Sequence, residues 1–339
     1  MAMSKLRQAV FYGVAALPAL VLLAAMGYLM FMTNAPQQAY LKYVRNINFD
    51  CFAIVDQPYV YRMMPGECHF NNLEYQTVQH IDAQGFRNPG PQAYQADTVI
   101  LGDSHAYGFA VNDADTLGAQ LKQRHGIDSL NLAIPTYATW RELAAATLHA
   151  PNAKTVVIQY CENDLEENGE YASFPPEEEA MVRKGVLQSI RDAQAVYHAN
   201  KAQASALDIV KAVAHVIVTH DFTSKRQLRD TARVRDVAHE GEVFAGMLYR
   251  YRDYLAHRRV ILLESVSFGR NSPAFKAAFE QAVHARLPDL DVRAIDSSQQ
   301  LKSSDYFFLD DHPRPSAYRK LADALAPLIA AARPANDQL

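Results

Sequence analysis

Residues 96–108 read ADTVILGDSHAYG, and this stretch decides the fold class. Its first half, Asp97–Leu101, is a short apolar and β-branched run, which is typical of a buried strand. A glycine, an aspartate and Ser104 follow at once, and residues of these types make a tight turn and begin a helix. A buried strand that turns straight into a helix is the repeating unit of a parallel α/β sheet.

The rest of the chain continues this alternation of short apolar runs and amphipathic stretches. Further strands are predicted at Ser129–Ile134, Thr155–Tyr160, Val260–Glu264 and Asp291–Ile295, and helices at Asp115–Arg124, Ala138–His149 and Pro315–Ala332. Strands of this kind separated by helices predict an α/β fold, with a parallel sheet that is covered on both faces.

Composition divides the chain into an apolar N-terminal run, a linker with a small β-rich segment, a main domain and a tail, over residues 1–33, 34–95, 96–333 and 334–339. In Asn48–Pro91, apolar and polar residues alternate over short stretches that turn residues separate, which favours a few antiparallel strands. A helical insertion is predicted at about 168–242. Within it, Lys225–Arg235 carries five basic residues, which form either a solvated helix face or a surface for an anionic glycan or lipid.

The N-terminal run predicts a membrane anchor. Ala9–Met32 is uncharged and apolar, and a helix needs about 20 apolar residues to cross a bilayer. Lys5 and Arg7 precede it, which favours a cytoplasmic N-terminus and places the remaining chain outside the cytoplasm. The alternatives are a cleaved signal peptide, whose apolar region is usually about 7–15 residues, and a buried core helix.

Charge and cysteine content limit the partners. The formal net charge is -4 and the pI about 6.3, so no basic excess predicts nucleic-acid binding. Cys51 and Cys68 can form a disulfide in an oxidising compartment, or they remain two unpaired thiols, because spacing alone does not decide pairing. No metal site or cofactor motif is predicted, since the sequence has no CxxC, HExxH, GxGxxG after a strand, or P-loop.

Chemically capable residues follow the predicted strands, and the carboxyl ends of parallel strands form the ligand-binding edge of such a sheet. Ser104 follows the first strand and presents a hydroxyl at the start of a helix. Asn163 follows the third strand, where its neutral amide can donate to an oxyanion. His312 precedes the last helix and can take the serine proton, with Asp310 or Asp311 to orient its ring.

In this order, the motifs GDSHAYG, the Asn of CENDL and the terminal DDHP resemble those of the SGNH (GDSL-like) hydrolases, and GFRNPG resembles a segment of cell-envelope members. The resemblance covers about Gly85 to Ala332 and implies a flavodoxin-like three-layer sandwich. It also implies Ser104 as nucleophile and oxyanion donor, Asn163 as side-chain donor, His312 as base and Asp310 as orienting acid.

The sequence departs from the family pattern at three positions. Thr136 stands where the family has a glycine whose N–H belongs to the oxyanion hole. Threonine keeps a backbone N–H, so the N–H of Thr136 is the expected donor. Cys161 replaces the first glycine of the usual GxND and places a thiol near the pocket. The orienting acid usually lies three residues before the histidine, where this chain has Leu309, and Asp310 lies two before.

A few further residues are candidates for the pocket or compete as nucleophiles. His105 is expected to line the pocket together with Cys161, although a purely structural role fits equally well. Ser265 and Ser267 follow the fourth strand but lack a nearby acid–base pattern. The absence of GxSxG excludes the nucleophile elbow of the α/β-hydrolases.

The resemblance implies a membrane-anchored serine esterase that removes O-acyl groups, chiefly acetyl, from a cell-envelope or exported polysaccharide through an acyl-serine. The main domain is expected in the periplasm, on a single-pass anchor in the inner membrane. An O-acetyltransferase with a membrane acyltransferase partner uses the same residues and is the first alternative. A non-catalytic glycan-binding or assembly protein on the same scaffold is the second.

Overall fold

The computed structural model describes residues 5–173, 179–199, 206–224, 227 and 235–331. The chain forms two compact units, each made of two separate stretches of sequence. Unit 1 is Met1–Arg45 with Ala204–Val234, and unit 2 is Asn46–Gln203 with Arg235–Leu339. The helical insertion predicted at about 168–242 is thus divided between the units. Most of the basic stretch 225–235 and the tail 334–339 lie outside the described residues.

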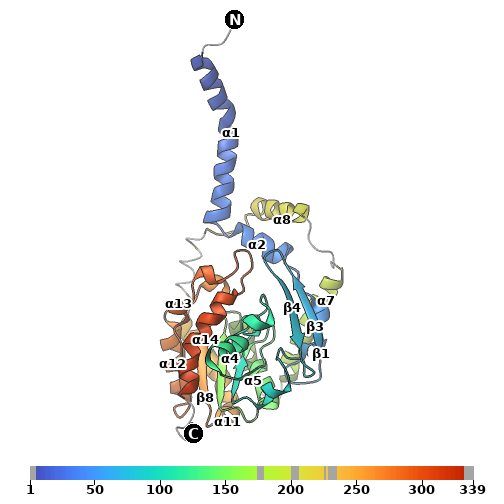
Figure 1. Cartoon of the computed structure of the whole chain (residues 1–339), viewed down its shortest axis with the longest axis vertical. Helices are drawn as coiled ribbons and strands as arrows, with labels where there is room; N and C mark the ends of the chain where they lie inside the picture. The colour runs from blue at the N-terminus through green and yellow to red at the C-terminus, as the bar shows by residue number, and fades with distance from the viewer. Residues whose placement is uncertain (1–4, 174–178, 200–205, 225–226, 228–234, 332–339) are drawn as a thin grey trace. The chain divides into compact units, whose positions relative to one another are not determined.

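Unit 2 is built on a five-stranded parallel sheet (Figure 1). In the order β6-β5-β7-β8-β9, its strands are Ser129–Asn131, Thr98–Leu101, Thr155–Tyr160, Arg259–Glu264 and Asp291–Ala294. This confirms the predicted α/β fold with a parallel sheet. β6 is shorter than expected, but hydrogen bonds from Leu132 to Ile100 and from Ile134 to Gly102 continue alongside β5 until Pro135.

Helices cover both faces of this sheet, and its central strands β5, β7 and β8 are accordingly buried along almost their whole length. On one face α4 (Leu117–His125) packs against α14 (Pro315–Ala330). On the other, α10 (Val237–Arg250) contacts both α5 (Thr139–His149) and α12 (Phe275–Arg286). The shorter helices of unit 2 are α3 (Ser104–Tyr107), α6 (Asp164–Ser173), α11 (Arg252–Leu255) and α13 (Ser297–Gln300). A longer one, α7 (Glu179–Ala199), follows α6.

Two antiparallel pairs precede the sheet, in the segment where the sequence predicts such strands. β1 (Phe52–Ile54) pairs with β2 (Tyr61–Met63), and β3 (Gly66–Asn71) pairs with β4 (Gln76–Ile81) in a hairpin. Cys51 and Cys68 form a disulfide with a Cα–Cα distance of 5.8 Å, which ties β3 to the start of β1.

Unit 1 contains the N-terminal helix α1 (Lys5–Met32), followed by α2 (Ala35–Tyr43) and by α8 (Ala206–Val218). Within α1, Val14–Met32 has a mean hydropathy of 2.2 and none of it is buried. By length and composition this stretch can cross a membrane, and a signal sequence near an N-terminus has the same properties. Pro18 lies inside the helix without ending it.

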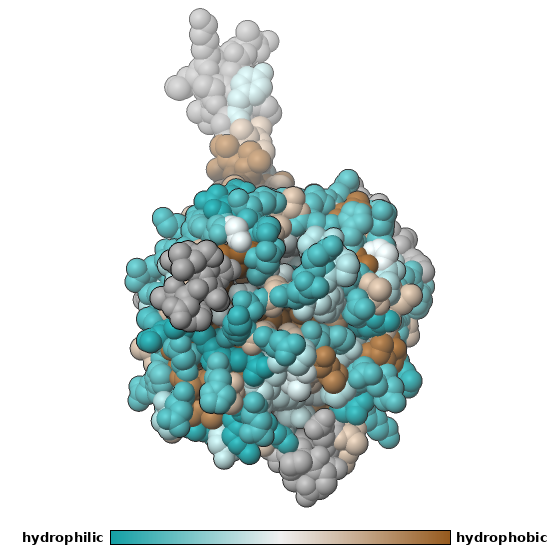
Figure 2. Space-filling model, turned by 60° about the horizontal axis from the view of Figure 1, so that its bottom comes forward, coloured by the Kyte–Doolittle hydropathy of each residue, from teal (hydrophilic) through white to brown (hydrophobic). Residues whose placement is uncertain are grey.

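The surface turned toward the viewer in Figure 2 is mostly hydrophilic, with hydrophobic residues scattered over it in small groups. Such a surface is ordinary for a domain that meets water, because scattered apolar side chains need no partner. Unit 2 buries its apolar residues in one continuous core that includes the strands and the inner faces of their helices.

Candidate active site

Ser104 lies in the turn that joins β5 to α3 at the carboxyl edge of the sheet. Gly102 makes this turn with a φ of 149°, and a Cβ atom there would come within 2.6 Å of the Gln159 side-chain oxygen. That oxygen accepts hydrogen bonds from the N–H groups of Asp103 and Ala106, at 3.3 and 3.1 Å. Glycine is therefore required, because only glycine leaves room for the amide that holds the turn.

Asp103 caps the helix that follows and contacts the predicted side-chain donor. Its carboxylate accepts hydrogen bonds from the His105 N–H at 2.8 Å and from the Asn163 amide at 3.4 Å. Asn163 follows β7, which neighbours β5, so the serine and the amide meet where the strand order reverses. Ser104 is half-buried, and its hydroxyl and N–H make no hydrogen bond within the described part of the chain.

Thr136 adopts a left-handed backbone conformation, the region that favours glycine. Its φ is 66°, which is unfavourable for a β-branched residue. The hydroxyl of Tyr61 contacts the Thr136 hydroxyl and donates to the Pro135 carbonyl at 3.0 Å. Arg141, buried and paired with Glu167 at 2.7 Å, donates to the Tyr61 oxygen at 2.8 Å and to the Thr136 carbonyl. This network holds the turn in place, although no sequence motif indicated it.

His312 is paired with a buried carboxylate. Its ring Nδ1 lies 2.5 Å from Asp310, and Asp311 lies farther away at 3.3 Å. The side chain of Asp310 is fully buried, and it also accepts a hydrogen bond from the His312 N–H at 3.1 Å. An Nδ1–H donated to Asp310 leaves the lone pair on Nε2, the nitrogen that takes up a proton. Asp310 thus occupies the place of the orienting acid.

Two residues of the β3–β4 hairpin hold Asp310, and no sequence pattern pointed to them. The Tyr75 hydroxyl donates to the second carboxylate oxygen of Asp310 at 3.0 Å. The Glu74 carboxylate accepts hydrogen bonds from the N–H groups of Phe308, Leu309 and Asp310, at 2.9, 2.7 and 2.9 Å. The hairpin therefore fixes the loop that carries His312.

The segment that carries Ser104 packs directly on the His312 ring. Phe109 stacks on it with ring centroids 4.8 Å apart, and the His105 ring lies 5.2 Å away. Both contacting residues lie within five positions of Ser104, so the predicted nucleophile and base come from segments in contact.

His105 and Cys161, which were expected to line the pocket, are instead buried beneath it, at 4% and 3% exposed. Burial lowers the pKa of His105 and raises the pKa of the Cys161 thiol well above its ordinary value. His105 Nδ1 lies 2.8 Å from the Ser265 hydroxyl, which also contacts Tyr306 at 3.2 Å. Both residues are therefore placed for structure, and neither is exposed to a substrate.

The competing serines are both engaged. Ser265 does have a histidine partner, which sequence reasoning missed, but it is only 1% exposed and closed to a substrate. Ser267 is half-buried and donates to Asp311 at 3.4 Å. Ser104 is the better-placed nucleophile of the three.

The GFRNPG segment supports the serine turn from outside. Arg87 is buried and donates to the Gly108 carbonyl at 2.6 Å, at the end of α3. The Asn88 side chain donates to the backbone carbonyl of Asn131 in β6 at 3.1 Å and accepts from the N–H of the same residue at 2.8 Å. The segment thus connects the serine turn to the edge strand.

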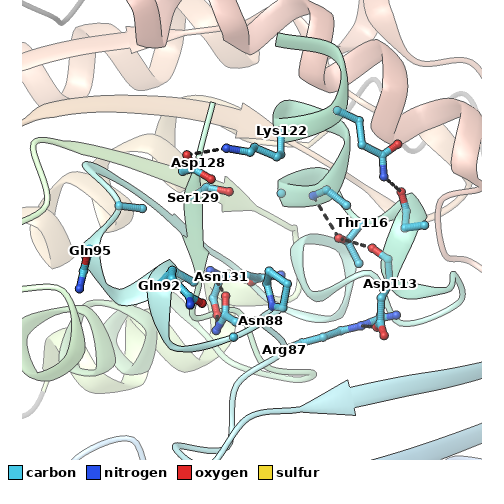
Figure 3. Close-up of a pocket in the computed structure, with 18 residues that line it drawn as sticks. Arg87, Asn88, Gln92, Gln95, Asp113, Thr116, Lys122, Asp128, Ser129 and Asn131 are labelled. Carbon is cyan, nitrogen blue, oxygen red and sulfur yellow. Dashed lines mark hydrogen bonds and ion pairs between the residues drawn. The ribbon is translucent and has the colours of Figure 1, made fainter. Parts of the chain in front are cut away.

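A cavity of about 800 Å³ lies beside this segment, against β6 (Figure 3). Its cations are both paired, Arg87 with Asp113 at 2.7 Å and Lys122 with Asp128 at 2.7 Å. No residue predicted for chemistry is among those that line it. We assign no activity to this cavity.

A second cleft, of about 820 Å³, reaches the predicted oxyanion donors. Thr136 and Asn163 both line it. One wall is a single face of α7, because the residues that line it recur at helical spacing. They are Met181, Val182, Gly185, Val186, Ser189, Ile190 and Ala193. Another wall carries the carboxylates of Glu166, Glu167 and Glu170. The helical insertion therefore forms part of the predicted site.

The ligand atoms of Asp310, Asp311 and His312 lie within 4.8 Å of one another, a spacing at which a metal ion can be held. The same Nδ1 atom faces both carboxylates, however, and Asp310 is already bonded by Tyr75. These contacts match a carboxylate-oriented base better than a metal centre.

Two buried carboxyl groups lie close to the serine turn. Both oxygens of Glu142, and one oxygen of Asp164, have no hydrogen-bond partner among the described residues. Burial, and next the charge of Asp164, raises the pKa of Glu142 well above its ordinary value. Burial raises the pKa of Asp164 in the same direction. Both carboxyls therefore favour their neutral forms.

Protein-family models and curated proteins give no match to this chain. Among solved structures it is similar to TesA, at 13% identity and a TM-score of 0.38, over 70% of this chain and 99% of that one. It is also similar to a carbohydrate esterase of family 2 from Corynascus thermopiles (Myceliophthora fergusii), at 14% identity and a TM-score of 0.37, over 73% and 69%. An acetyl xylan esterase from Butyrivibrio proteoclasticus is similar at 10% identity and a TM-score of 0.36, over 77% of this chain and 68% of that one. At these values the similarities do not establish a family or an activity.

Replacing Tyr75 by Phe removes one donor from the buried Asp310 carboxylate. A hydrogen bond to a charged group contributes about 1.5–3 kcal/mol, so we expect the kcat of any reaction that uses His312 as its base to fall about 10- to 100-fold. KM should change little, because Tyr75 acts through Asp310 and His312. Tyr254→Phe, which removes a hydroxyl donor to the Ala150 carbonyl, is the matched control. Equal kcat values for the two variants would contradict this role.

Replacing Glu142 by Gln should stabilise the protein more at pH 8 than at pH 4. The Glu142 carboxyl keeps its proton in the folded chain at pH values where the unfolded chain has released it. The contribution of Glu142 to the free energy of unfolding is therefore fully present below about pH 4.5 and is lost as the pH rises toward the folded pKa. Glutamine removes this loss. Thermal unfolding in detergent at both pH values tests it, with the exposed Glu242→Gln as control. A difference between Glu142→Gln and natural protein that does not grow with pH overturns the prediction.

Proposed function

We propose that this chain is a membrane-anchored serine esterase of the SGNH type, which removes acyl groups from a substrate outside the cytoplasm. The observation that carries the proposal is the buried Asp310–His312 pair, 2.5 Å apart and packed on the segment that presents Ser104. A histidine that a carboxylate orients, packed on the segment that presents a serine, is an arrangement that suits nucleophilic acyl transfer.

In the proposed mechanism, His312 Nε2 takes the proton of the Ser104 hydroxyl as its oxygen attacks the ester carbonyl carbon. The tetrahedral intermediate collapses, the alcohol leaves with the proton from His312, and an acyl-serine remains. Water then attacks this ester, with His312 again as base, and the acid is released with Ser104 restored. Asp310 stabilises the imidazolium in both half-reactions.

Three donors are proposed for the oxyanion: the N–H groups of Ser104 and Thr136 and the side-chain amide of Asn163. Neither N–H has a hydrogen-bond partner within the described residues. Asn163 uses one amide hydrogen on Asp103, at 3.4 Å, which leaves the second for a substrate. Donors fixed before the reaction stabilise developing charge most effectively.

The shape and charge of the cleft favour an extended, uncharged or cationic alcohol portion. A volume of about 820 Å³ far exceeds an acetyl group and fits several sugar rings. The exposed Glu166 adds negative charge, while Arg141, a cation of the cleft, is already paired with Glu167. We therefore propose an acylated neutral glycan of the cell envelope or an exported polysaccharide as substrate.

Two features support a site outside the cytoplasm. The apolar stretch Val14–Met32 follows Lys5 and Arg7, the charge order of an anchor with its N-terminus inside. The Cys51–Cys68 disulfide is of a kind that persists in oxidising compartments such as the periplasm. We propose a single-pass inner-membrane protein with a periplasmic main domain.

The other two functions compatible with the sequence are less well supported. The departures at Thr136, at Cys161 and at the orienting acid motivate a non-catalytic role, yet Thr136 has a positive φ and Asp310 contacts His312. Transfer of the acyl group to a sugar hydroxyl uses the same residues as hydrolysis and differs only in the acceptor.

The mechanism predicts that Ser104→Ala and His312→Ala lower the kcat for 4-nitrophenyl acetate by about 10³-fold or more, and that Asp310→Asn also lowers it strongly. The full chain purified in detergent is the sample. Ser265→Ala, the buried serine beside His105, serves as the matched control and should retain turnover. Loss of turnover in Ser265→Ala with Ser104→Ala active would contradict the assignment.

The charge of the cleft predicts discrimination against anionic esters. Replacing Glu166 by Gln should raise kcat/KM for 4-nitrophenyl hemisuccinate up to a few-fold, because an exposed charge contributes roughly 0.2–1 kcal/mol. The value for neutral 4-nitrophenyl acetate should not change. Glu242→Gln, at an exposed residue that does not line the cleft, is the control, and salt should reduce the effect. If the ratio of the kcat/KM values for the two esters is the same in the variant and in the natural protein, the Glu166 carboxylate does not discriminate against anionic esters and the prediction is wrong.

A further inference from the structure

Helix α8 in unit 1 has apolar residues on two opposite faces. Ala212 and Val216 are buried, at 5% and 0% exposed, on the side that packs within unit 1, where α8 contacts α2. On the opposite side Leu207, Val210 and Val218 are 61%, 64% and 76% exposed. A helix with an apolar stripe normally buries that stripe against something.

The exposed residues form a continuous stripe. Leu207, Val210, Ala214 and Val218 follow one another at intervals of three and four residues, so they share one side of the helix. Asp208, Lys211 and His215 lie together on one flank and are all exposed. An apolar stripe bordered by charged residues is typical of a helix that lies in the interface of a bilayer.

The chain holds the end of α8 at the point where α1 ends. Asn34, the second residue after the apolar stretch, donates its N–H to the Thr223 carbonyl at 3.0 Å, and its side chain accepts from the Thr223 N–H at 2.6 Å. Thr33 and Ser224 form an antiparallel bridge beside them. Only residues 219–222 lie between the end of α8 at Val218 and Thr223, so α8 stays close to that point.

Contacts along α2 position α8 further. Lys42 pairs with Asp221 at 2.6 Å, and the Tyr43 ring meets the His215 ring edge-on at 5.3 Å. In Figure 1, α8 runs across the direction of α1 and beside α2. If α1 crosses the bilayer, its end at Met32 marks the membrane surface, and α8 lies at that surface.

We infer that α8 is a second membrane-binding element, lying in the headgroup region with Leu207, Val210 and Val218 directed toward the acyl chains. The inference rests on the proposed anchoring of α1. It differs from that proposal because it assigns a lipid partner to a helix about 170 residues away in sequence. Lipid is the occupant chosen because the hydrogen bonds at Asn34 place α8 beside the exit of the anchor.

The test uses the full chain reconstituted in phosphatidylcholine–phosphatidylglycerol vesicles, with one fluorophore at a time on an introduced cysteine. Val210→Cys carries the probe on the stripe, and Asp208→Cys carries it on the polar flank. Leu22→Cys, in the middle of α1, reports the anchor. The native cysteines do not interfere, since Cys51 and Cys68 are bonded and Cys161 is buried.

Quenching by lipids with a spin label near the headgroup reports on Val210→Cys and Asp208→Cys, and lipids with a label at the end of the acyl chain report on Leu22→Cys. The inference predicts strong quenching at Val210→Cys and weak quenching at Asp208→Cys. A probe at Val210→Cys that iodide quenches from water, with Leu22→Cys quenched by lipid, would overturn it while leaving the anchor intact. Protection of Val210→Cys from both quenchers would also overturn it, because protein would then cover the stripe. Absence of lipid quenching at Leu22→Cys would instead contradict the anchor.

Discussion

The Glu74 carboxylate accepts hydrogen bonds from three successive backbone N–H groups, those of Phe308, Leu309 and Asp310. This interaction fixes the loop that carries the base, because a loop without secondary structure has few other partners for its amides. Tyr75, the next residue, bonds the Asp310 carboxylate itself. The geometry of the Asp310–His312 pair therefore depends on a hairpin outside the α/β sheet, and the Cys51–Cys68 disulfide holds that hairpin to its neighbour strand pair.

Much of the sheet was predictable because its strands are buried on both faces and read as apolar runs. Thr155–Tyr160 matched its strand at both ends, and Ser104 and Asn163 lie at the strand ends where the topology predicts a site. The hairpin strands were also predictable from alternation. Their role was not, because Tyr75 and Asp310 are 235 residues apart and period-two alternation does not specify a distant partner.

Other features depend on contacts that no local pattern encodes. The N–H of Thr136 was expected as an oxyanion donor, but the contacts of Tyr61 and Arg141 that hold its backbone at a positive φ have no sequence pattern. His105 and Cys161 were expected at the pocket because they neighbour site residues, and the tight turns direct them into the core instead. The association of α8 with the N-terminal segment joins Met1–Arg45 to Ala204–Val234, and neither composition nor periodicity specifies such a distant partner.

The central claim is that Ser104 becomes covalently acylated. Treating the full chain with a fluorophosphonate and mapping the adduct by peptide mass spectrometry tests it most directly, since the reagent needs an activated serine. The proposal predicts a single phosphonylated peptide, the one that contains Ser104, and no adduct in His312→Ala. An adduct on Ser267 or another serine, or no adduct on well-folded protein, would contradict it.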